Sequence, residues 1–403
     1  MANTFEIIGK LAIGKESEKF KPYSSKTYDS GWVNNELNFN AIAGDNRHML
    51  KIKGGYMKDG SGKVFTFSKS GKSDSDEVIK GEKLEIAWKD RFKPEIIENV
   101  AEFKKFVIDV EEQGKRFKLE KALDKFKEGL LQDGDLEELG VTDIEKAFED
   151  SKKKRKEFIA EADFAEYIYK LISSGKIDNR MFKILGNIVY SEYKGKIYKN
   201  LMPTRIYLAE KDAVPSSTAQ ITLFFNKNSL DSTLLKKTGK YYINGFVRDY
   251  DSSRKTDIPC NVSLVIDTNK DEQDETSKKF NALMLKQFTV KDKSWKEFGL
   301  KVNMLDGAQK VEITDDMLND FQKEMIELNP DYIDEIRKEL GGNVYGDRIQ
   351  EFIITSTARG YSKGVKDTKY IDSDFVIPEI EIKDKPNNST EDDDIFDLDE
   401  IPF

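Results

Sequence analysis

The feature that most constrains the fold is a change in hydrophobic period along the chain. Within residues 1–93, short segments rich in β-branched and aromatic residues alternate with clusters of Gly, Asn, Asp and Ser. These segments are 5–14, 32–43, 49–56, 63–67 and 83–88. Several short strands separated by turn residues are typical of a small barrel. We therefore predict a β-rich barrel over residues 1–93.

The pattern then becomes helical. Apolar residues recur at helical spacing in the stretches 96–110, 119–130 and 158–172. Thr142 followed by Glu145 is a capping-box signature, which predicts the start of one helix. We predict a helical insertion over residues 94–178.

From Met181 the two-residue period returns. Strand candidates lie at 182–193, 196–208, 219–225, 240–250 and 258–267, with a short helix expected over 228–237. Three strands, a helix and two strands is the order of an OB-fold, a five-stranded partly open barrel. We predict an OB-fold domain over residues 179–270, an OB-like barrel over 1–93 and an α/β extension packed on the OB domain over 271–380. The fold class is α+β and mainly β.

Three glycines interrupt apolar strand candidates and form a weak internal repeat, namely Gly9, Gly186 and Gly245. Glycine weakens a strand, so within one it usually marks a bend, a bulge or a close backbone approach. Small barrels need such points to close. We expect these glycines to lie where strands bend or cross.

The net charge is unevenly distributed. The 403 residues include 66 Lys and Arg against 75 Asp and Glu, which gives a formal charge of -9. Seven of these acids lie in residues 391–403, and without that segment 66 basic residues face 68 acidic ones. Like charges at such density keep a segment extended. We predict a nearly neutral globular body and a disordered acidic tail over residues 381–403.

Several function classes are excluded by composition. The sequence contains no uninterrupted apolar run long enough to span a bilayer, and residues 1–4 have no basic or apolar leader, so we expect a soluble cytoplasmic protein. Cys260 and His48 are the single cysteine and the single histidine. A disulfide framework, a multi-cysteine zinc site and a histidine-rich metal site therefore cannot form. We expect no metal, no cofactor and no catalytic site.

The last residues of the sequence combine acids with apolar side chains. Ile401, Pro402 and Phe403 follow the acidic run, and an aromatic ring beside an α-carboxylate can be captured by an apolar pocket with a basic rim. We interpret this segment as a protein-docking peptide. The alternative is a generic acidic tail that aids solubility.

This ending resembles the acidic C-terminal tip of bacterial single-stranded-DNA-binding proteins. The matching residues are Asp399, Glu400, Ile401, Pro402 and Phe403, while Leu398 departs from the pattern and Asp397 restores the charge. Residues 234–250 also resemble the helix-to-strand stretch of that family, in which a Lys-Gly turn leads into a strand. The resemblance is specific in the tail and fair over 180–268. It implies an OB-fold, single-stranded-DNA binding and recruitment of replication and recombination proteins through the tip. This chain is longer than those bacterial proteins, and its greater length implies a phage-encoded member of the family.

Binding of single strands without sequence preference requires a basic groove and aromatic faces on which bases stack. In the strand at 240–250, alternation places Phe246, Arg248 and Tyr250 on one face, and we expect a face that bears Arg to be exposed. The candidate contacts on the second barrel are Tyr190, Tyr193, Lys194, Lys196, Tyr198, Lys199, Arg205, Phe246, Arg248, Tyr250 and Arg254. Those on the first barrel are Trp32, Lys51, Lys53, Tyr56 and Trp88, and Phe65 and Arg91 have the same chemistry. The loop 359–364 offers Arg359, Tyr361 and Lys363 as further phosphate contacts.

The same residues leave other functions open. A strand-annealing protein or recombination mediator would share the groove, a metal-dependent nuclease would need clustered carboxylates, and a scaffold would use the tail alone. Homo-oligomerisation is also left open. We further hypothesise that residues 391–403 compete with DNA for the basic groove, since both are anionic.

Overall fold

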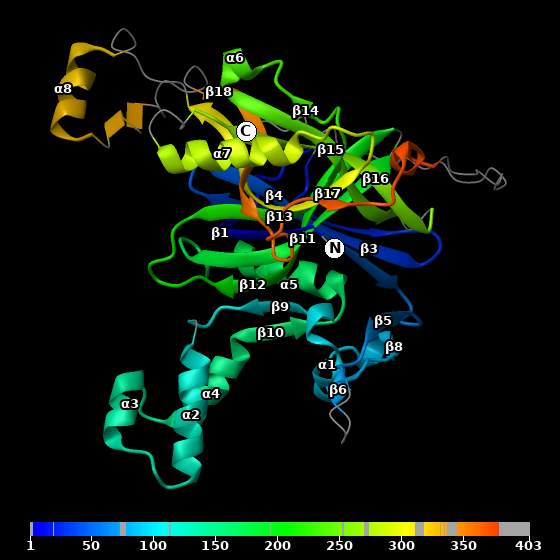
Figure 1. Cartoon of the computed structure of the whole chain (residues 1–403). Coiled ribbons are helices and arrows are strands. Elements are labelled where there is room, and N and C mark those ends of the chain that lie inside the picture. Colours follow the sequence, from blue (N-terminus) through cyan, green and yellow to red (C-terminus); the bar gives the residue numbers. More distant parts are fainter. Residues whose placement is uncertain are drawn as a thin grey trace.

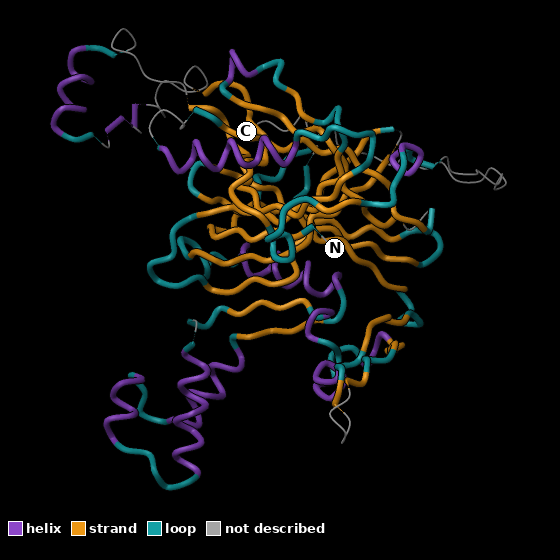
Figure 2. Tube along the Cα trace, viewed as in Figure 1, coloured by secondary structure: helices purple, strands orange, loops and turns teal. Residues whose placement is uncertain are grey.

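The computed structural model describes residues 3–18, 20–72, 78–112, 114–193, 195–251, 254–269, 274–310, 318–330, 332–333, 335–336 and 345–378. Lys194 and the tail candidates Asp397, Asp399, Glu400, Ile401, Pro402 and Phe403 lie outside these ranges. Strands predominate, and most of them join one large sheet. They form the middle of the molecule, and several helices lie at its periphery (Figure 2). The mainly-β class is therefore confirmed.

The first barrel is closed by five strands from two separate parts of the chain. These are β1 (Thr4–Ala12), β3 (Trp32–Ala43), β4 (Asn46–Met57), β11 (Met181–Tyr193) and β12 (Lys196–Leu208). Neighbours run in the order β1-β3-β4-β12-β11 and back to β1, all antiparallel except the parallel pair β4–β12. Helix α5 (Glu161–Ser173) precedes β11 and packs against β3 and β4. The short strand β2 (Tyr23–Thr27) pairs with β3.

The second barrel repeats this arrangement. Its strands are β13 (Ser216–Phe225), β15 (Lys240–Asp251), β16 (Thr256–Asp267), β17 (Lys296–Lys310) and β18 (Tyr345–Thr357). They pair in the order β13-β15-β16-β18-β17 and back to β13, again with a single parallel pair, β16–β18. Helix α7 (Glu275–Phe288) lies between β16 and β17 in sequence. The smaller elements of this half are β14 (Leu230–Asp231), α6 (Leu235–Thr238), α8 (Asp320–Leu328), β19 (Lys366–Asp367) and η5 (Asp372–Phe375).

The two barrels share a sheet and a core. Strand β1 pairs with β13 of the second barrel as well as with β3 and β11 of its own. Inward side chains of both barrels, such as Phe39 and Phe298, belong to one cluster of buried hydrophobic residues. The alternation of buried and exposed positions along each strand places apolar residues inside, as the two-residue period predicts.

The domain boundaries predicted from sequence are wrong in three places, two of which concern the barrels. The sequence predicts that β11 and β12 open the barrel at 179–270, but they complete the first barrel with β1, β3 and β4. The second barrel instead takes β17 and β18 from the expected extension at 271–380. Local periodicity identifies strands but carries no information on which distant strand they pair with, and this explains the error.

A large insertion separates β4 from α5. Its strands β5 (Lys63–Phe67) and β8 (Lys83–Ala87), which we expected in the first barrel, form a separate two-stranded sheet. The other elements are β6 (Gly71–Lys72), β7 (Val78–Ile79), η1 (Trp88–Asp90), α1 (Pro94–Asn99), η2 (Glu102–Lys104), β9 (Phe106–Asp109) and β10 (Arg155–Phe158), and an arm of α2 (Lys115–Lys127), α3 (Asp133–Leu139) and α4 (Ile144–Lys153). Figure 1 shows the β5–β8 lobe and the helical arm projecting from the same side of the first barrel.

The three strand glycines lie at points of close approach, as predicted. A Cβ atom on Gly9 would overlap the carbonyl oxygen of Ile42, and one on Gly186 would overlap the carbonyl oxygen of Met202. A Cβ atom on Gly245 would likewise overlap the carbonyl oxygen of Phe224. Any side chain at these positions would force the strands apart.

His48 lies buried on β4 near Asp306, Arg348 and Lys199, and its Nε2 has no hydrogen-bond partner among the described residues. Burial lowers its pKa from 6.5 to about 4, although Asp306 opposes the shift. The unfolded chain therefore binds a proton between pH 6.5 and 4 that the folded chain does not bind. We expect stability to be full above pH 6.5 and to fall towards pH 4, by about 3 kcal/mol in total.

Urea unfolding at several pH values would measure this loss. The matched variant is His48→Leu, which removes the titrating ring from the single histidine position. The difference in unfolding free energy between the two proteins should change with pH across the window. Parallel pH profiles would show that His48 does not cause the dependence.

Candidate nucleic-acid interface

The outer face of β3 and β4 carries three of the predicted contacts. Trp32, Lys51 and Lys53 all point away from the barrel interior, since the alternate residues on both strands are buried. The Trp32 side chain is 40% exposed. Lys51 forms an ion pair with Glu36 at 2.8 Å, whereas Lys53 is exposed. The structure thus gathers an aromatic ring and two ammonium groups on one surface.

Tyr56 and Trp88 form a closed stack. Their ring centroids are 4.8 Å apart at an interplanar angle of 11°. The Arg91 guanidinium lies 3.8 Å from the centre of the Trp88 ring and binds Asp163 with two hydrogen bonds. Trp88 is buried, so its prediction as a base-stacking residue is wrong. The physical reason is that Tyr56 and Arg91 already cover the indole.

Of the predicted DNA contacts on the β11–β12 hairpin, some lie in the core and others lie on the surface. Tyr190 is buried in the hydrophobic core that the two barrels share, where burial raises the pKa of its phenol, so it cannot stack on a base. Tyr193 and Tyr198 are half-buried, and Lys196 is exposed near the turn. The Lys199 side chain is exposed, and its ammonium lies 4.6 Å from the centre of the Phe352 ring on β18. Lys199 therefore contacts the second barrel.

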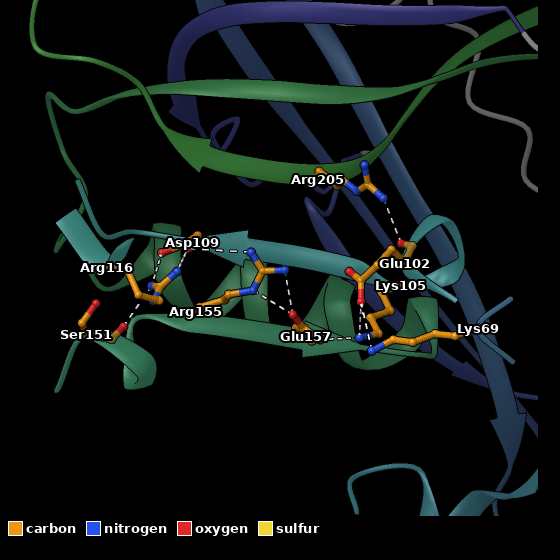
Figure 3. A network of polar contacts seen from close by, with 9 residues as sticks. All are labelled: Lys69, Glu102, Lys105, Asp109, Arg116, Ser151, Arg155, Glu157 and Arg205. Carbon is orange, nitrogen blue, oxygen red and sulfur yellow. Dashed lines mark hydrogen bonds and ion pairs between the residues drawn. The ribbon is translucent and has the colours of Figure 1, made fainter. Parts of the chain in front are cut away.

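Arg205 serves a structural role, contrary to prediction. Its guanidinium donates a hydrogen bond of 2.9 Å to the backbone carbonyl of Glu102 in η2. Figure 3 shows this contact at one end of a polar network along β9 and β10. In that network Lys105 binds Glu102 at 2.8 Å and Glu157 at 2.9 Å, and Glu157 binds Arg155 at 2.7 Å. The network joins the insertion to β12, so Arg205 holds the insertion in place.

Charge pairing in this network is tight enough to shift pKa values. Burial opposes the charged form of Lys105, but the hydrogen bonds that its ammonium donates to Glu102 and Glu157 raise its pKa overall. Burial likewise disfavours ionised Asp109, yet Arg116 holds its pKa below the usual range. Arg116 also donates a 3.0 Å hydrogen bond to the carbonyl of Ser151 and thereby joins α2 to α4, while its pairing with Asp109 attaches the helical arm to β9.

The predicted alternation along β15 is confirmed, but the outer face is partly covered. Ile243, Gly245 and Val247 are buried, and Tyr250 is 60% exposed. Phe246 packs against other rings, including Trp295 at 5.7 Å between centroids.

The two arginines predicted as phosphate contacts in this region already bind acceptors within the chain. Arg248 donates hydrogen bonds to the backbone carbonyls of Asp374 and Asp257. Arg254 forms ion pairs with Glu192 and Asp251 at 2.7 and 2.8 Å, so its assignment as a free phosphate contact is wrong. In the loop at 359–364, Tyr361 is buried and donates a hydrogen bond to Glu297, so it is a core residue.

The structure also brings together exposed rings and cations, of which the sequence analysis identified only Phe65 as a candidate contact. Phe65, Phe67 and Phe103 are 61%, 40% and 70% exposed. The Lys83 ammonium is 5.4 Å from the centre of the Phe65 ring, and Lys104 is 5.5 Å from that of Phe67 and 5.8 Å from that of Phe103. We call these five residues, with Lys63, the aromatic–lysine cluster.

A cleft of about 370 Å³ lies beside this cluster, between the insertion and the first barrel. Lys63, Phe65, Phe103 and Lys104 line it from the insertion, and β4, β11 and β12 supply Gly55, Asn187 and Thr204. Glu161 at the start of α5 also lines the cleft, and burial raises the pKa of its carboxyl group. The cleft therefore presents aromatic faces, ammonium groups and polar side chains together.

Other kinds of site receive no support from the described residues. Among them, no group of three or more His, Cys, Asp or Glu is placed to hold a metal ion. None of their helices combines the length and apolar character needed to cross a membrane.

Comparisons with known proteins give little information on the family of this chain. No family model and no curated protein matches the chain. Among solved structures, a deletion mutant of the single-stranded DNA binding protein from Thermus aquaticus is similar, with a TM-score of 0.26 and 8% sequence identity. The similarity covers 75% of this chain and 86% of that chain. A likeness this weak carries no functional argument.

Proposed function

We propose that this protein binds single-stranded DNA without sequence preference, through the aromatic–lysine cluster and the adjoining cleft. The observation that carries the proposal is the exposure of Phe65, Phe67 and Phe103 beside lysine ammonium groups. Exposed rings stack on unpaired bases and ammonium groups neutralise phosphates. A duplex hides the faces of its bases, so this arrangement favours a single strand.

We further propose that both barrels are OB-folds. Their strand order and their single parallel pair, between the third and fifth strands, support this assignment. OB-folds bind oligonucleotides on the second and third strands and on adjoining loops. The corresponding strands here are β3 with β4 and β15 with β16. Trp32 and Lys53 on the first pair, with Lys196 on the β11–β12 hairpin, would extend the site.

The negative net charge is compatible with this function. Affinity for nucleic acid depends on local neutralisation of phosphates and release of counterions, not on the total charge of the protein. Seven of the excess acids belong to residues 391–403, which leaves the rest of the sequence close to neutral. Local clustering of lysines then suffices for binding.

For the cellular role, we propose protection of single-stranded DNA during phage replication or recombination in a bacterial cytoplasm. The acidic tip would recruit replication and repair proteins, and we propose no enzymatic activity. The support is the resemblance of residues 399–403 and 234–250 to bacterial single-stranded-DNA-binding proteins.

The decisive test is a fluorescence-anisotropy titration of labelled oligo-dT with the full chain at several salt concentrations. We expect tight binding at low salt and a linear fall of log K with log salt, with a slope near -0.7 for each phosphate neutralised. A blunt duplex of equal length should bind much more weakly. Preference for the duplex would overturn the proposal.

Three further outcomes would replace this function by another. Rapid pairing of complementary strands would indicate an annealing protein or a recombination mediator. Cleavage of the oligonucleotide in Mg²⁺ would indicate a nuclease, and no affinity at any salt would leave only a scaffold.

A further inference from the structure

Residues 370–378 cross the second barrel and cover part of its outer face. We call this segment the strap, and its element η5 (Asp372–Phe375), orange-red in Figure 1, lies beside β16. The Phe375 ring lies on Trp295, with centroids 3.7 Å apart at an interplanar angle of 25°. It also approaches Phe246 at 5.1 Å, while Tyr370 meets Phe224 edge-on at 5.3 Å.

Polar contacts accompany these rings. The Trp295 Nε1 donates a 2.8 Å hydrogen bond to Oδ1 of Asp372. Arg248 donates one of 2.9 Å to the carbonyl of Asp374, and Arg254 donates one of 2.9 Å to the carbonyl of Pro378. The strap therefore presents a flat ring and a row of oxygen atoms to the barrel. A stacked nucleotide presents the same two features.

One donor on this surface has no partner. The Nε of Arg248 is buried and has no hydrogen-bond acceptor within the described part of the chain, although its two terminal nitrogens are both bonded. A buried donor without an acceptor is costly, at about 1–3 kcal/mol. The strap therefore leaves the Nε of Arg248 without an acceptor, and a ligand oxygen beside it would supply one.

The strap is held chiefly by one side chain. From 371 to 378, Phe375 is the buried residue, and Ile371 and Val376 are 64% and 66% exposed. Burial of a single phenylalanine is worth about 1.5–3 kcal/mol, which a stacked base with its phosphate contacts can match.

We propose that Trp295, Phe246 and Arg248 form a second nucleotide-stacking site, and that the strap occupies it until single-stranded DNA displaces Phe375. This inference rests on the proposed function and adds a mode of regulation to it. DNA must then compete with the strap, so the measured affinity is the intrinsic affinity reduced by the fraction of molecules in which the strap is open.

The test compares Phe375→Ala and Asp372→Ala with the wild-type full chain in oligo-dT titrations. The first variant removes the competing ring, and the second removes only the acceptor of Trp295 Nε1 and leaves the aromatic packing in place. If the strap is closed in nine-tenths of the molecules, Phe375→Ala should tighten binding up to about tenfold, with a smaller gain for Asp372→Ala. Val376→Ala, an exposed residue of the strap, is the matched control and should bind like wild type.

Photocrosslinking of oligo-dT gives a second readout that does not depend on affinity. Crosslinks to Trp295 should increase in Asp372→Ala relative to wild type. If wild type binds oligo-dT but both strap variants bind equally or more weakly, without added crosslinks at Trp295, the strap is permanent packing and the inference is wrong. The proposed function would survive that result. If wild type does not bind oligo-dT, both proposals fail together.

Discussion

Replacing Phe65 and Phe103 together by alanine should weaken oligo-dT binding at least about 30-fold. Each base–aromatic stack is worth about 1–3 kcal/mol, and the lower limit for two stacks corresponds to this factor. Both side chains are mainly exposed, at 61% and 70%, so the double variant should keep its fold. Anisotropy titrations at constant salt measure the affinity, and thermal unfolding verifies the fold.

Phe117→Ala provides the matched control. Phe117 on the helical arm is 59% exposed and lies under the Lys121 ammonium at 4.5 Å, so it has the same local chemistry away from the cluster. Its loss should leave affinity within about twofold, as expected for a surface residue that makes no contact with the ligand. Equal losses from the two variants would mean that the cluster is not the binding site.

The lysines of the cluster should act differently from its rings. Lys83→Ala with Lys104→Ala removes two proposed phosphate contacts and should reduce the magnitude of the salt slope by about 1.4, since each contributes about 0.7 on a single strand. The double phenylalanine variant should lower affinity at every salt concentration and leave the slope unchanged. This contrast separates stacking from charge neutralisation in one set of titrations.

Local features of the fold could be predicted because they depend on neighbours in sequence. The alternation along β15 places Ile243 and Val247 inside, as the two-residue period indicates. Gly9 and Gly186 lie at close approaches, since only glycine leaves room for a crossing strand there. These inferences required no knowledge of distant pairing.

Pairing between distant segments could not be predicted in this way. The parallel contact of Leu50 with Leu201 closes the first barrel across the whole insertion, and no local pattern indicates it. The same limit affects the site. The sequence predicts Tyr190 to be a surface aromatic beside lysines, but it is buried in the core that the barrels share. Phe103 is predicted as one apolar position of a helix, but it is 70% exposed.

The sequence also does not indicate which partners the charged side chains bind. Arg205, Arg248 and Arg254 have the right chemistry for phosphate contacts, yet each already binds a carbonyl or carboxylate of the chain itself. The sequence contains more acids than bases, so most arginines have an available internal acceptor. The lysines over Phe65, Phe67 and Phe103 were harder to identify, because their distinguishing property is the exposure of the rings beneath them.

Deleting residues 391–403 should tighten oligo-dT binding several-fold at low salt. The deletion removes seven acids and no base, which changes the formal charge from -9 to -2. A covalently attached anionic segment competes with phosphate for the same lysines at high effective concentration. The gain should shrink as salt rises, because the Debye length falls from about 30 Å at 0.01 M to about 10 Å at 0.1 M.

Two additional reagents make this test specific. A synthetic peptide of residues 391–403, added to the truncated protein, should restore the weaker binding at low salt, and a scrambled peptide of the same composition should do so equally if charge alone matters. In the full chain, Ile401→Ala with Phe403→Ala keeps every acid and should leave DNA affinity unchanged while abolishing any docking of partner proteins. Weaker DNA binding after the deletion would contradict competition, because it would mean that the acidic segment supports the complex. An unchanged affinity at all salt concentrations would instead place the segment outside the range of the DNA site and confine its role to recruitment.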